Sequence, residues 1–369
     1  MGIALAWRNL SENRTRFIIS VGGIALAILL VLSLDGIVAG SIRQVSVYID
    51  ETPFDLVVSQ KGVKNLHMTT SFFDADLVDK VRRIDGVKKV TTILYTTDYL
   101  VSGDNRSVAY IIGYEQGKTG GPWMMDKGTE KLRTGEIIID RDIAAKDKLL
   151  LGDRVTIFGR DFKIAGFTKG TVTIVNSIAY IRFDDFERLR GLRSVVSYAF
   201  VDTKTGNSPD AVMGKIKKDI TQVSVQTKKE FADSERKVVS DMSADIMKIM
   251  NLIGFLIGMA ALGLTVYTAT LAKVREYGIL KAVGSRNTWL FRVVFEQAAI
   301  STLAGTAIAF TLVLLLKAGL ALSSSNILIV VGWDSFLRIA AISMMIGVMA
   351  SAIPIIKILR LDPADVFRR

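Results

Sequence analysis

The 369-residue chain has no cysteine and only one histidine, His67. Without cysteine it forms no disulfide and offers no Cys-His nucleophile pair. A single histidine leaves no ordinary zinc site, since such sites draw on several His or Cys ligands, and it argues against a Ser-His-Asp triad. We therefore predict no catalytic residue and no metal site in this chain.

The middle of the chain lacks any long apolar run, and four such runs lie outside it, at residues 17–39, 249–272, 293–316 and 336–358. Each run has about 20 residues or more, enough to cross a hydrocarbon core of about 30 Å as a helix. The first is longer than a signal-peptide core and no clean A-x-A site follows it, so we expect a retained helix. The sequence predicts an α-helical membrane protein with four transmembrane helices and an α+β extracytoplasmic domain, residues 40–245, between helices 1 and 2.

Basic residues gather at the edges of the apolar runs, in the N-terminal segment 1–16, the loop 273–292 and the tail 359–369. By contrast, residues 318–335 contain no Lys or Arg. The positive-inside rule predicts that both termini and the 273–292 loop are cytoplasmic and that the inserted domain lies outside. The net charge of +11 then reflects contact with the lipid membrane, not a nucleic-acid partner.

The inserted region shows a helix-turn-strand pattern at residues 74–100, with Asp74 as a plausible N-cap, and a similar pattern at 195–227. Two such units far apart in the sequence suggest one α+β layer built from both ends of the domain. Between them, residues 136–167 alternate short strands with Gly-containing turns. We expect a β-rich subdomain at about 115–190, inserted in the first layer.

Residues 111–119 read IIGYEQGKT and resemble a phosphate-binding loop. That loop needs four residues between its glycines and a helix after it. Gly113 and Gly117 have only three between them, and Gly120-Gly121-Pro122 follows. We therefore predict a turn-rich surface loop here and no cofactor bound by this chain.

The loop after the second run reads KVREYGILKAVGSR at residues 273–286. Taken alone, this is either an ordinary basic connector or a short helix that Gly284 ends. It resembles the REIGILKAIGAS element of the MacB/FtsX-like permease family, also called type VII ABC transporters. Residues 1–16, FEQA at 295–298, LDPADV at 361–366 and the stretch 132–167 also resemble segments of that family, so the likeness covers essentially the whole chain.

The resemblance implies a permease subunit in the cytoplasmic membrane of a bacterium or archaeon, coupled to a cytoplasmic ABC ATPase dimer that binds ATP and Mg. In the family, the loop after helix 2 docks on that ATPase, and the outer domain moves in response, which is called mechanotransmission. The positions implied to couple to the ATPase are Arg275, Glu276, Gly278, Ile279, Lys281, Ala282 and Gly284.

The family also implies a second permease copy, either identical or a close relative. Asp35 near the outer end of helix 1 and Glu296 near the inner end of helix 3 are acids inside apolar runs, which either reach the headgroup region or line a seam or ligand site. Gly22, Gly23, Gly254 and Gly258 permit close helix approach, within one subunit or across a dimer seam.

Two functions stay open at this point. The first is export or extraction of a hydrophobic or amphipathic substrate: a lipoprotein, peptide, glycolipid, toxin or haem. The alternative is an FtsX-like regulator that activates a cell-wall hydrolase, a cell-envelope partner, without transport. Substrate-stimulated ATP hydrolysis distinguishes them, because only a transporter would show it.

Overall fold

The computed structural model describes residues 14–171, 177–283, 285, 287–322 and 327–359. Most of the N-terminal segment 1–16, nearly all of the tail 359–369, and Gly284 therefore lie outside the described residues. The chain divides into two compact units. We call them the membrane unit (Met1–Ala39, Met242–Leu320 and Ile329–Arg369) and the inserted domain (Gly40–Asp241 with Ala321–Leu328).

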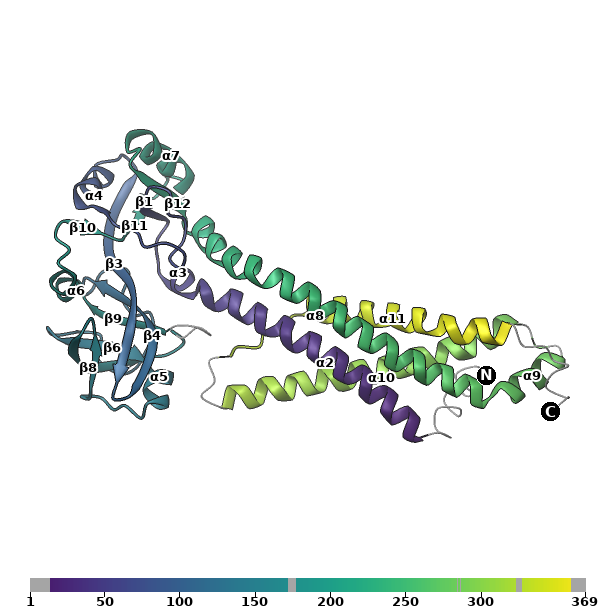
Figure 1. Ribbon diagram of the computed structural model, residues 1–369. Helices are drawn as coiled ribbons and strands as arrows, with labels where there is room; N and C mark the ends of the chain where they lie inside the picture. The colour runs from purple at the N-terminus through teal and green to yellow at the C-terminus, as the bar shows by residue number, and fades with distance from the viewer. Residues whose placement is uncertain (1–13, 172–176, 284, 286, 323–326, 360–369) are drawn as a thin grey trace. The chain divides into compact units, whose positions relative to one another are not determined.

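The membrane unit is built from long helices that run side by side (Figure 1). They are α2 (Arg14–Val45), α8 (Lys228–Ala272), α10 (Asn287–Leu322) and α11 (Trp333–Leu359), with the short α9 (Val274–Ala282) between α8 and α10. Within the described ranges, these four long helices are long and apolar enough to cross a membrane. The predicted spans all fall inside them.

Two of the four helices extend well beyond the spans predicted from hydropathy. Helix α8 has 45 residues and begins at Lys228, about twenty residues before its apolar run. The added residues, 228–248, contain neither Gly nor Pro and are rich in helix formers, so nothing in the sequence ends the helix there. Helix α2 likewise continues to Val45.

One apolar cluster fills the centre of the membrane unit, with contributions from every helix in it, including Ile28, Leu262, Tyr277, Val294 and Ile346. Many large apolar side chains on the outer faces of the four long helices are exposed, such as Ile19, Leu26, Leu256 and Leu315. A helix bundle whose side chains are apolar both inside and on its outer faces is typical of a bundle surrounded by membrane lipid.

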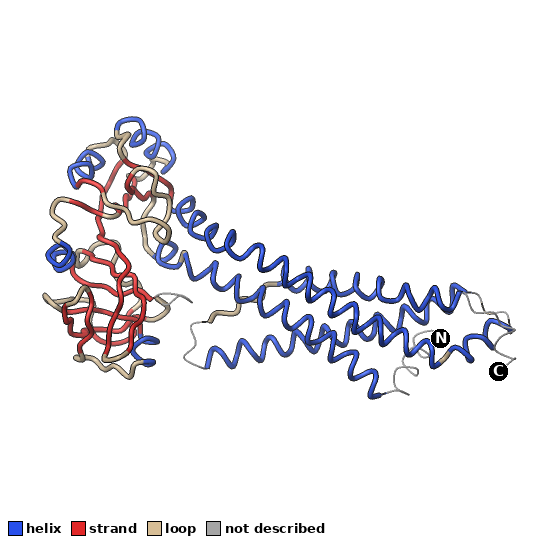
Figure 2. The backbone as a smooth tube through the Cα atoms, viewed as in Figure 1, coloured by secondary structure: helices blue, strands red, loops and turns tan. Residues whose placement is uncertain are grey.

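The inserted domain is organised around a 10-stranded sheet among its described residues (Figure 2). The strands follow the order β12-β1-β11-β3-β4-β9-β6-β8-β5, and β7 pairs with β3 and β8. Their bounds are β1 Leu56–Gln60, β3 Val87–Ser102, β4 Asn105–Tyr114, β5 Met125–Gly128, β6 Glu136–Asp140, β7 Arg154–Ile157, β8 Arg160–Thr168, β9 Ser177–Arg182, β11 Tyr198–Thr203 and β12 Val223–Thr227. A small pair, β2 (Phe73–Asp74) with β10 (Val195–Val196), stands apart.

Five short helices complete the described part of the domain: α3 Val47–Glu51, α4 Ala75–Arg82, α5 Arg141–Lys146, α6 Phe183–Arg190 and α7 Pro209–Asp219. Helices α4 and α7 share one apolar cluster with β1, β3, β11 and β12, which confirms the layer built from both ends of the domain. Asp74 caps α4 as predicted, accepting the N–H of Asp76 at 3.2 Å.

The segment 115–190 differs from the separate β-rich subdomain that the sequence suggested. Its strands β5, β6, β7, β8 and β9 belong to the same large sheet. The connection is the parallel pairing of β4 with β9, from Ala109–Ser177 to Tyr114–Arg182. This pairing joins residues almost seventy positions apart, and local sequence patterns carry no information about it.

Candidate functional site

Helix α9 is fixed to the core of the membrane unit by one face. The side chain of Tyr277 is only 2% exposed and lies in the central apolar cluster. Leu280, three residues further on, packs against the same cluster. Residues three apart lie on one side of a helix, so α9 has a defined inner face and cannot rotate freely.

The opposite face of α9 is exposed. Arg275, Glu276, Ile279, Ala282 and the following Val283 are all exposed, with Ile279 at 42% and Val283 at 82%. At 100° per residue these positions fall within about 120° of arc, so they form one continuous surface. The surface combines one basic and one acidic group with three apolar side chains. Glu276 also pairs with Lys273 at 2.8 Å.

The structure thus separates the residues that the family resemblance assigned to coupling. Arg275, Glu276, Ile279 and Ala282 lie on the exposed face of α9. Gly278 is buried and Lys281 is half-buried, both away from that face. Gly284 is outside the described residues. Tyr277, which the sequence reading did not select, anchors the helix.

Asp35 lies in an ion pair inside the membrane unit. Its Oδ1 atom is 2.6 Å from an Nη atom of Arg338 on α11, and the two side chains are 10% and 58% exposed. Nearby, the N–H of Val330 donates to the carbonyl of Gly36 at 3.0 Å. These contacts fasten α2 to the start of α11 within one chain.

The four glycines proposed for a dimer seam have different surroundings. A side-chain carbon at Gly23 would lie 3.0 Å from Ala261, and one at Gly254 would overlap Val31. Gly258 faces Ile346 at 3.5 Å. These three permit close packing inside the subunit. A side chain at Gly22 would meet nothing within 4 Å, so Gly22 faces outward.

Glu296, the second acid assigned to an apolar run, lies near the start of α10. Its Oε1 atom pairs with Nε of Arg292 at 2.8 Å, one helical turn earlier. Among the described residues, its buried Oε2 atom has no hydrogen-bond partner. The pair spans i to i+4 and stays within one helix. The two acids thus have different partners, and neither lies beside the other.

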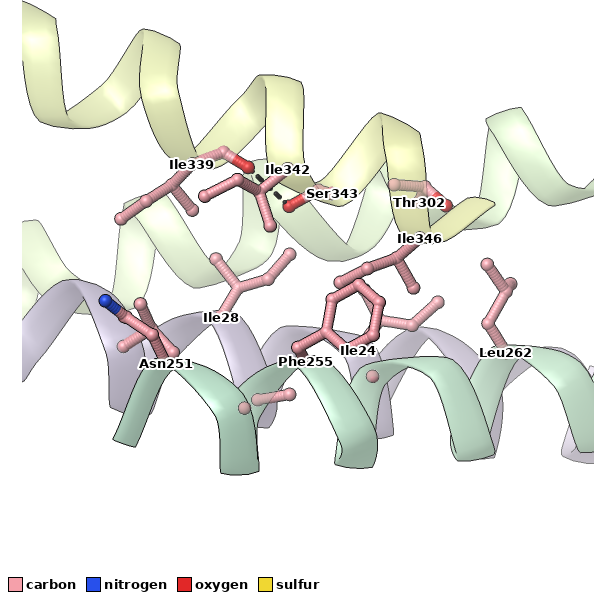
Figure 3. A pocket seen from close by; sticks show the side chains of 14 residues that line it. Ile24, Ile28, Asn251, Phe255, Leu262, Thr302, Ile339, Ile342, Ser343 and Ile346 are labelled. Carbon is pink, nitrogen blue, oxygen red and sulfur yellow. Dashed lines mark hydrogen bonds between the residues drawn. The ribbon is translucent and has the colours of Figure 1, made fainter. Parts of the chain in front are cut away.

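A cavity of about 50 Å³ lies among α2, α8, α10 and α11 (Figure 3). Isoleucines of α11 face it from one side, and isoleucines of α2 lie with Phe255 and Leu262 of α8 on the other. Gly254 and Gly258 also line it, because they leave room beside α2. Its few polar groups include Asn251, Ser343 and Thr302, whose buried hydroxyl has no partner among the described residues. The cavity is therefore suited to apolar atoms with few hydrogen bonds.

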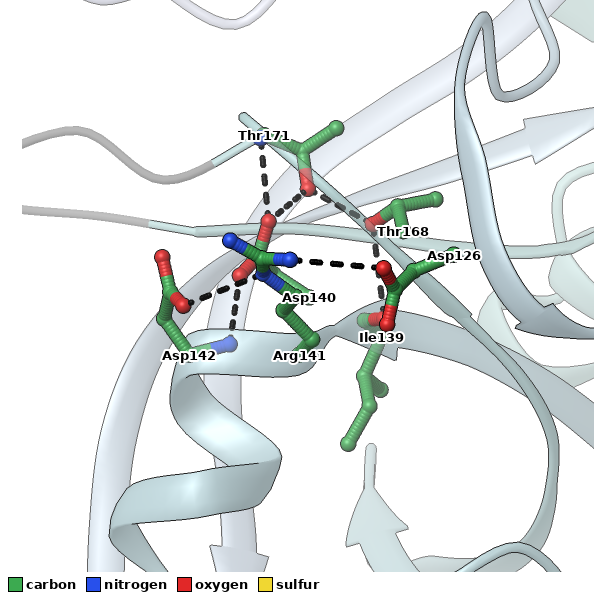
Figure 4. Close-up of polar contacts among 7 residues, drawn as sticks. All are labelled: Asp126, Ile139, Asp140, Arg141, Asp142, Thr168 and Thr171. Atoms are coloured by element: carbon green, nitrogen blue, oxygen red, sulfur yellow. Dashed lines mark hydrogen bonds and ion pairs between the residues drawn. The ribbon is translucent and has the colours of Figure 1, made fainter. Parts of the chain in front are cut away.

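A buried carboxylate, Asp140, organises one corner of the inserted domain (Figure 4). Its Oδ1 atom accepts the N–H of Asp142 at 2.7 Å and so caps α5. Its Oδ2 atom accepts the N–H and the hydroxyl of Thr171 at 2.9 and 2.6 Å. Burial raises the pKa of Asp140, although the hydrogen bonds from Thr171 oppose the rise. Across the described residues, no group of three or more acidic or histidine side chains is placed to hold a metal.

Asp140→Asn is expected to remove a pH dependence from the stability of the inserted domain. Because the folded-state pKa of Asp140 is raised, its contribution is fully present below the ordinary Asp value of about 3.9 and is lost as pH rises through the raised value. Urea unfolding of the excised domain, residues 41–240, between pH 4 and pH 8 measures this. Asp104→Asn, at an exposed carboxylate elsewhere in the domain, is the control. Identical pH slopes for wild type and Asp140→Asn would contradict the prediction.

Comparison with known families identifies the chain. The family model of the MacB-like periplasmic core domain matches residues 17–219, more than half of the chain. The family model of the FtsX-like permease C-terminal region matches residues 248–363. The chain belongs to the MacB/FtsX-like ABC transporter permease family. The exposed face of α9 lies in the part of this permease that matches the FtsX-like model, and Asp140 lies in the part that matches the MacB-like model.

Relatives of this permease align with nearly its whole length, although their sequence identity to it is low. A protein of Staphylococcus haemolyticus named as a hemin transport system permease, HrtB, is 22% identical over 363 residues, 98% of each chain. An uncharacterised ABC transporter permease of Methanocaldococcus jannaschii is 23% identical and covers 99% of this chain and 97% of its own.

Two solved structures also resemble parts of this permease. The extracellular domain of the ABC-type transporter YknZ from Gram-positive bacteria aligns with 47% of the chain and 98% of its own length, at 16% identity and a TM-score of 0.35. The periplasmic region of MacB from Actinobacillus actinomycetemcomitans aligns with 50% and 94%, at 11% identity and a TM-score of 0.37.

Proposed function

We propose that this permease is the membrane subunit of an ABC transporter that works by mechanotransmission. A separate cytoplasmic ATPase dimer hydrolyses ATP, and the movement it causes in the permease displaces the inserted domain on the other side of the membrane. The result is export or extraction of a hydrophobic or amphipathic substrate. The permease acts as a pair with a second copy of itself or with a close relative.

The exposed face of α9 is the observation that carries the proposal. A helix that is locked into the core through Tyr277 and Leu280 moves together with the transmembrane helices. A surface of Arg275, Glu276, Ile279, Ala282 and Val283 on such a helix suits a soluble protein partner, because it offers both charge pairs and apolar contact. The basic residues around it support a cytoplasmic position for this loop, and with it for both termini.

The lining of the membrane-unit cavity supports the class of substrate. The cavity among α2, α8, α10 and α11 is mostly apolar, which favours apolar or amphipathic molecules. Hemin is one candidate of this kind, since the relative from Staphylococcus haemolyticus is named for hemin transport. The regulator of a cell-wall hydrolase stays the second candidate, because residues 248–363 match the FtsX-like model.

Substrate-stimulated ATP hydrolysis tests the proposal. The permease is purified with its ATPase, reconstituted in liposomes and supplied with hemin, a lipidated peptide or no addition. A transporter is expected to hydrolyse ATP about fivefold faster with its substrate, because the substrate favours the hydrolysis-competent state. Formation of the complex with no response to any substrate, together with activation of a cell-wall hydrolase, would favour the regulator instead. Failure of the permease to bind any ABC ATPase would contradict both.

A further inference from the structure

The only histidine of the chain faces a buried carboxylate at the start of α8. The Nδ1 atom of His67 lies 2.5 Å from Oε2 of Glu235. The side chain of Glu235 is fully buried and that of His67 is 17% exposed. The other carboxylate oxygen of Glu235 accepts the backbone N–H of Leu66. Glu235 thus receives two contacts from adjacent residues of the loop that follows β1.

This loop is held on its other side by strands of the sheet. The hydroxyl of Tyr198, on β11, donates to the carbonyl of Asn65 at 3.1 Å. The ring of Tyr110, on β4, meets the ring of His67 edge to face, with centroids 4.9 Å apart. The loop therefore lies between α8 and two central strands, and it contacts both through polar or aromatic groups.

The first turns of α8 also contact the domain in other ways. The Nζ atom of Lys228 donates to the carbonyls of Asp50 and Thr52, both at 2.8 Å. Phe231 and Ala232 pack into the apolar core of the domain, and apolar packing has no directional preference. Arg236 binds Asp50 at 2.7 Å, but this pair is about one-third exposed and joins α8 to α3. A buried pair of charged or polar groups resists separation far more than an exposed one, because separation leaves a charge without a partner.

We propose that the His67–Glu235 pair is the joint through which α8 moves the sheet of the inserted domain. Helix α8 runs without interruption from Lys228 to Ala272, so it carries any displacement of its membrane-spanning part to Glu235. The pair then passes the displacement to the loop and to β4 and β11. His67 and Glu235 are positioning residues: they touch no substrate. This inference rests on the proposed function, since it needs α8 to move when ATP is hydrolysed.

His67→Ala in the full permease–ATPase complex tests the joint. We expect complex formation and basal ATP hydrolysis to persist, while the substrate-stimulated part of hydrolysis falls about fivefold or more. His67→Gln, which still donates a hydrogen bond, is expected to restore much of the loss. Lys229→Ala, at an exposed position on the same helix, is the matched control and should change nothing.

A distance measurement separates failure of the joint from failure of the proposed function. Spin labels are placed on cysteines at the exposed Met68 and Lys237, which is clean because the chain has no native cysteine. Pulsed electron resonance should give a narrow distance distribution in wild type and a broad one in His67→Ala. Should His67→Ala not fold, His67→Phe, which fills the same space and cannot donate a hydrogen bond, carries the same comparison. A narrow distance distribution and undiminished substrate-stimulated ATP hydrolysis in these variants would contradict the role of the His67–Glu235 pair. A wild-type complex whose ATP hydrolysis does not respond to substrate would instead contradict the proposed function.

Discussion

Replacing Ile279 by Asp and Glu276 by Lys is expected to abolish co-purification of the permease with its ATPase. Both side chains lie on the exposed face of α9, so neither change disturbs the apolar core beneath. A buried charge at 279 and a reversed charge at 276 each oppose binding at the centre of the surface. Hot-spot changes of this kind cost about 2 kcal/mol or more each, so the pair should weaken binding about a thousandfold.

The double variant should still insert into the membrane, which fluorescence-detected size-exclusion chromatography would show. Leu150→Asp makes a comparable apolar-to-acidic change at an exposed position of the inserted domain, and it should leave the complex intact. Survival of the complex in the α9 variant would mean that the 273–292 loop is only a connector between two helices.

Arg338→Leu is expected to destabilise the membrane unit far more than Asp35→Leu. Removing Arg338 leaves the 10%-exposed Asp35 as a charge without its partner, a change that typically costs about 3 kcal/mol or more. Removing Asp35 leaves Arg338, which is more than half exposed and whose long side chain can reach the interface. The two single variants therefore break the same ion pair but lose different amounts of stability.

Thermal unfolding in detergent, followed by tryptophan fluorescence, measures both losses. The double variant Asp35→Leu/Arg338→Leu should recover most of the stability lost in Arg338→Leu, because no unpaired charge remains. Equal losses in the two single variants, or no recovery in the double variant, would show that the pair does not work by charge compensation. Ser33→Leu, two residues before Asp35 on α2, controls for the added bulk.

The features that the sequence predicted well are those that depend on local composition. The four apolar runs lie in the four helices that can cross a membrane, and Asp74 is the N-cap of α4, as predicted. One of the Gly-containing turns predicted within residues 136–167, at Gly159, joins β7 to β8 in a hairpin. The stretch around Gly117 forms turns and leads to strand β5, which agrees with the turn-rich loop predicted there.

The features that the sequence could not predict join residues that are far apart in the chain. Asp35 and Arg338 are separated by 303 positions, and His67 and Glu235 by 168. Each residue alone looks like an ordinary polar group in a loop or a helix. The inner face of α9 was also missed, since a tyrosine in a basic loop gives no sign that it is buried.

The predicted dimer seam remains a prediction, but the structure changes how it should be tested. Gly23, Gly254 and Gly258 already have close neighbours in their own subunit, whereas Gly22 does not. Ala25 is only 2% exposed, so a cysteine there would point into the subunit. Leu26, on the outward side of α2, is the better position for a cross-link between copies.

The unbroken length of α8 also restricts how this gene can change. Within the membrane unit, Gly254 and Leu262 are eight residues apart on this helix, and each must face its own neighbours, Val31 and the central apolar cluster. Inserting one residue between them would rotate one site by about 100° relative to the other. Inserting seven would restore the angle to within about 20° while lengthening the helix by about two turns. Length variation in this stretch should therefore occur in whole heptads, even where the intervening side chains are exposed and free to vary.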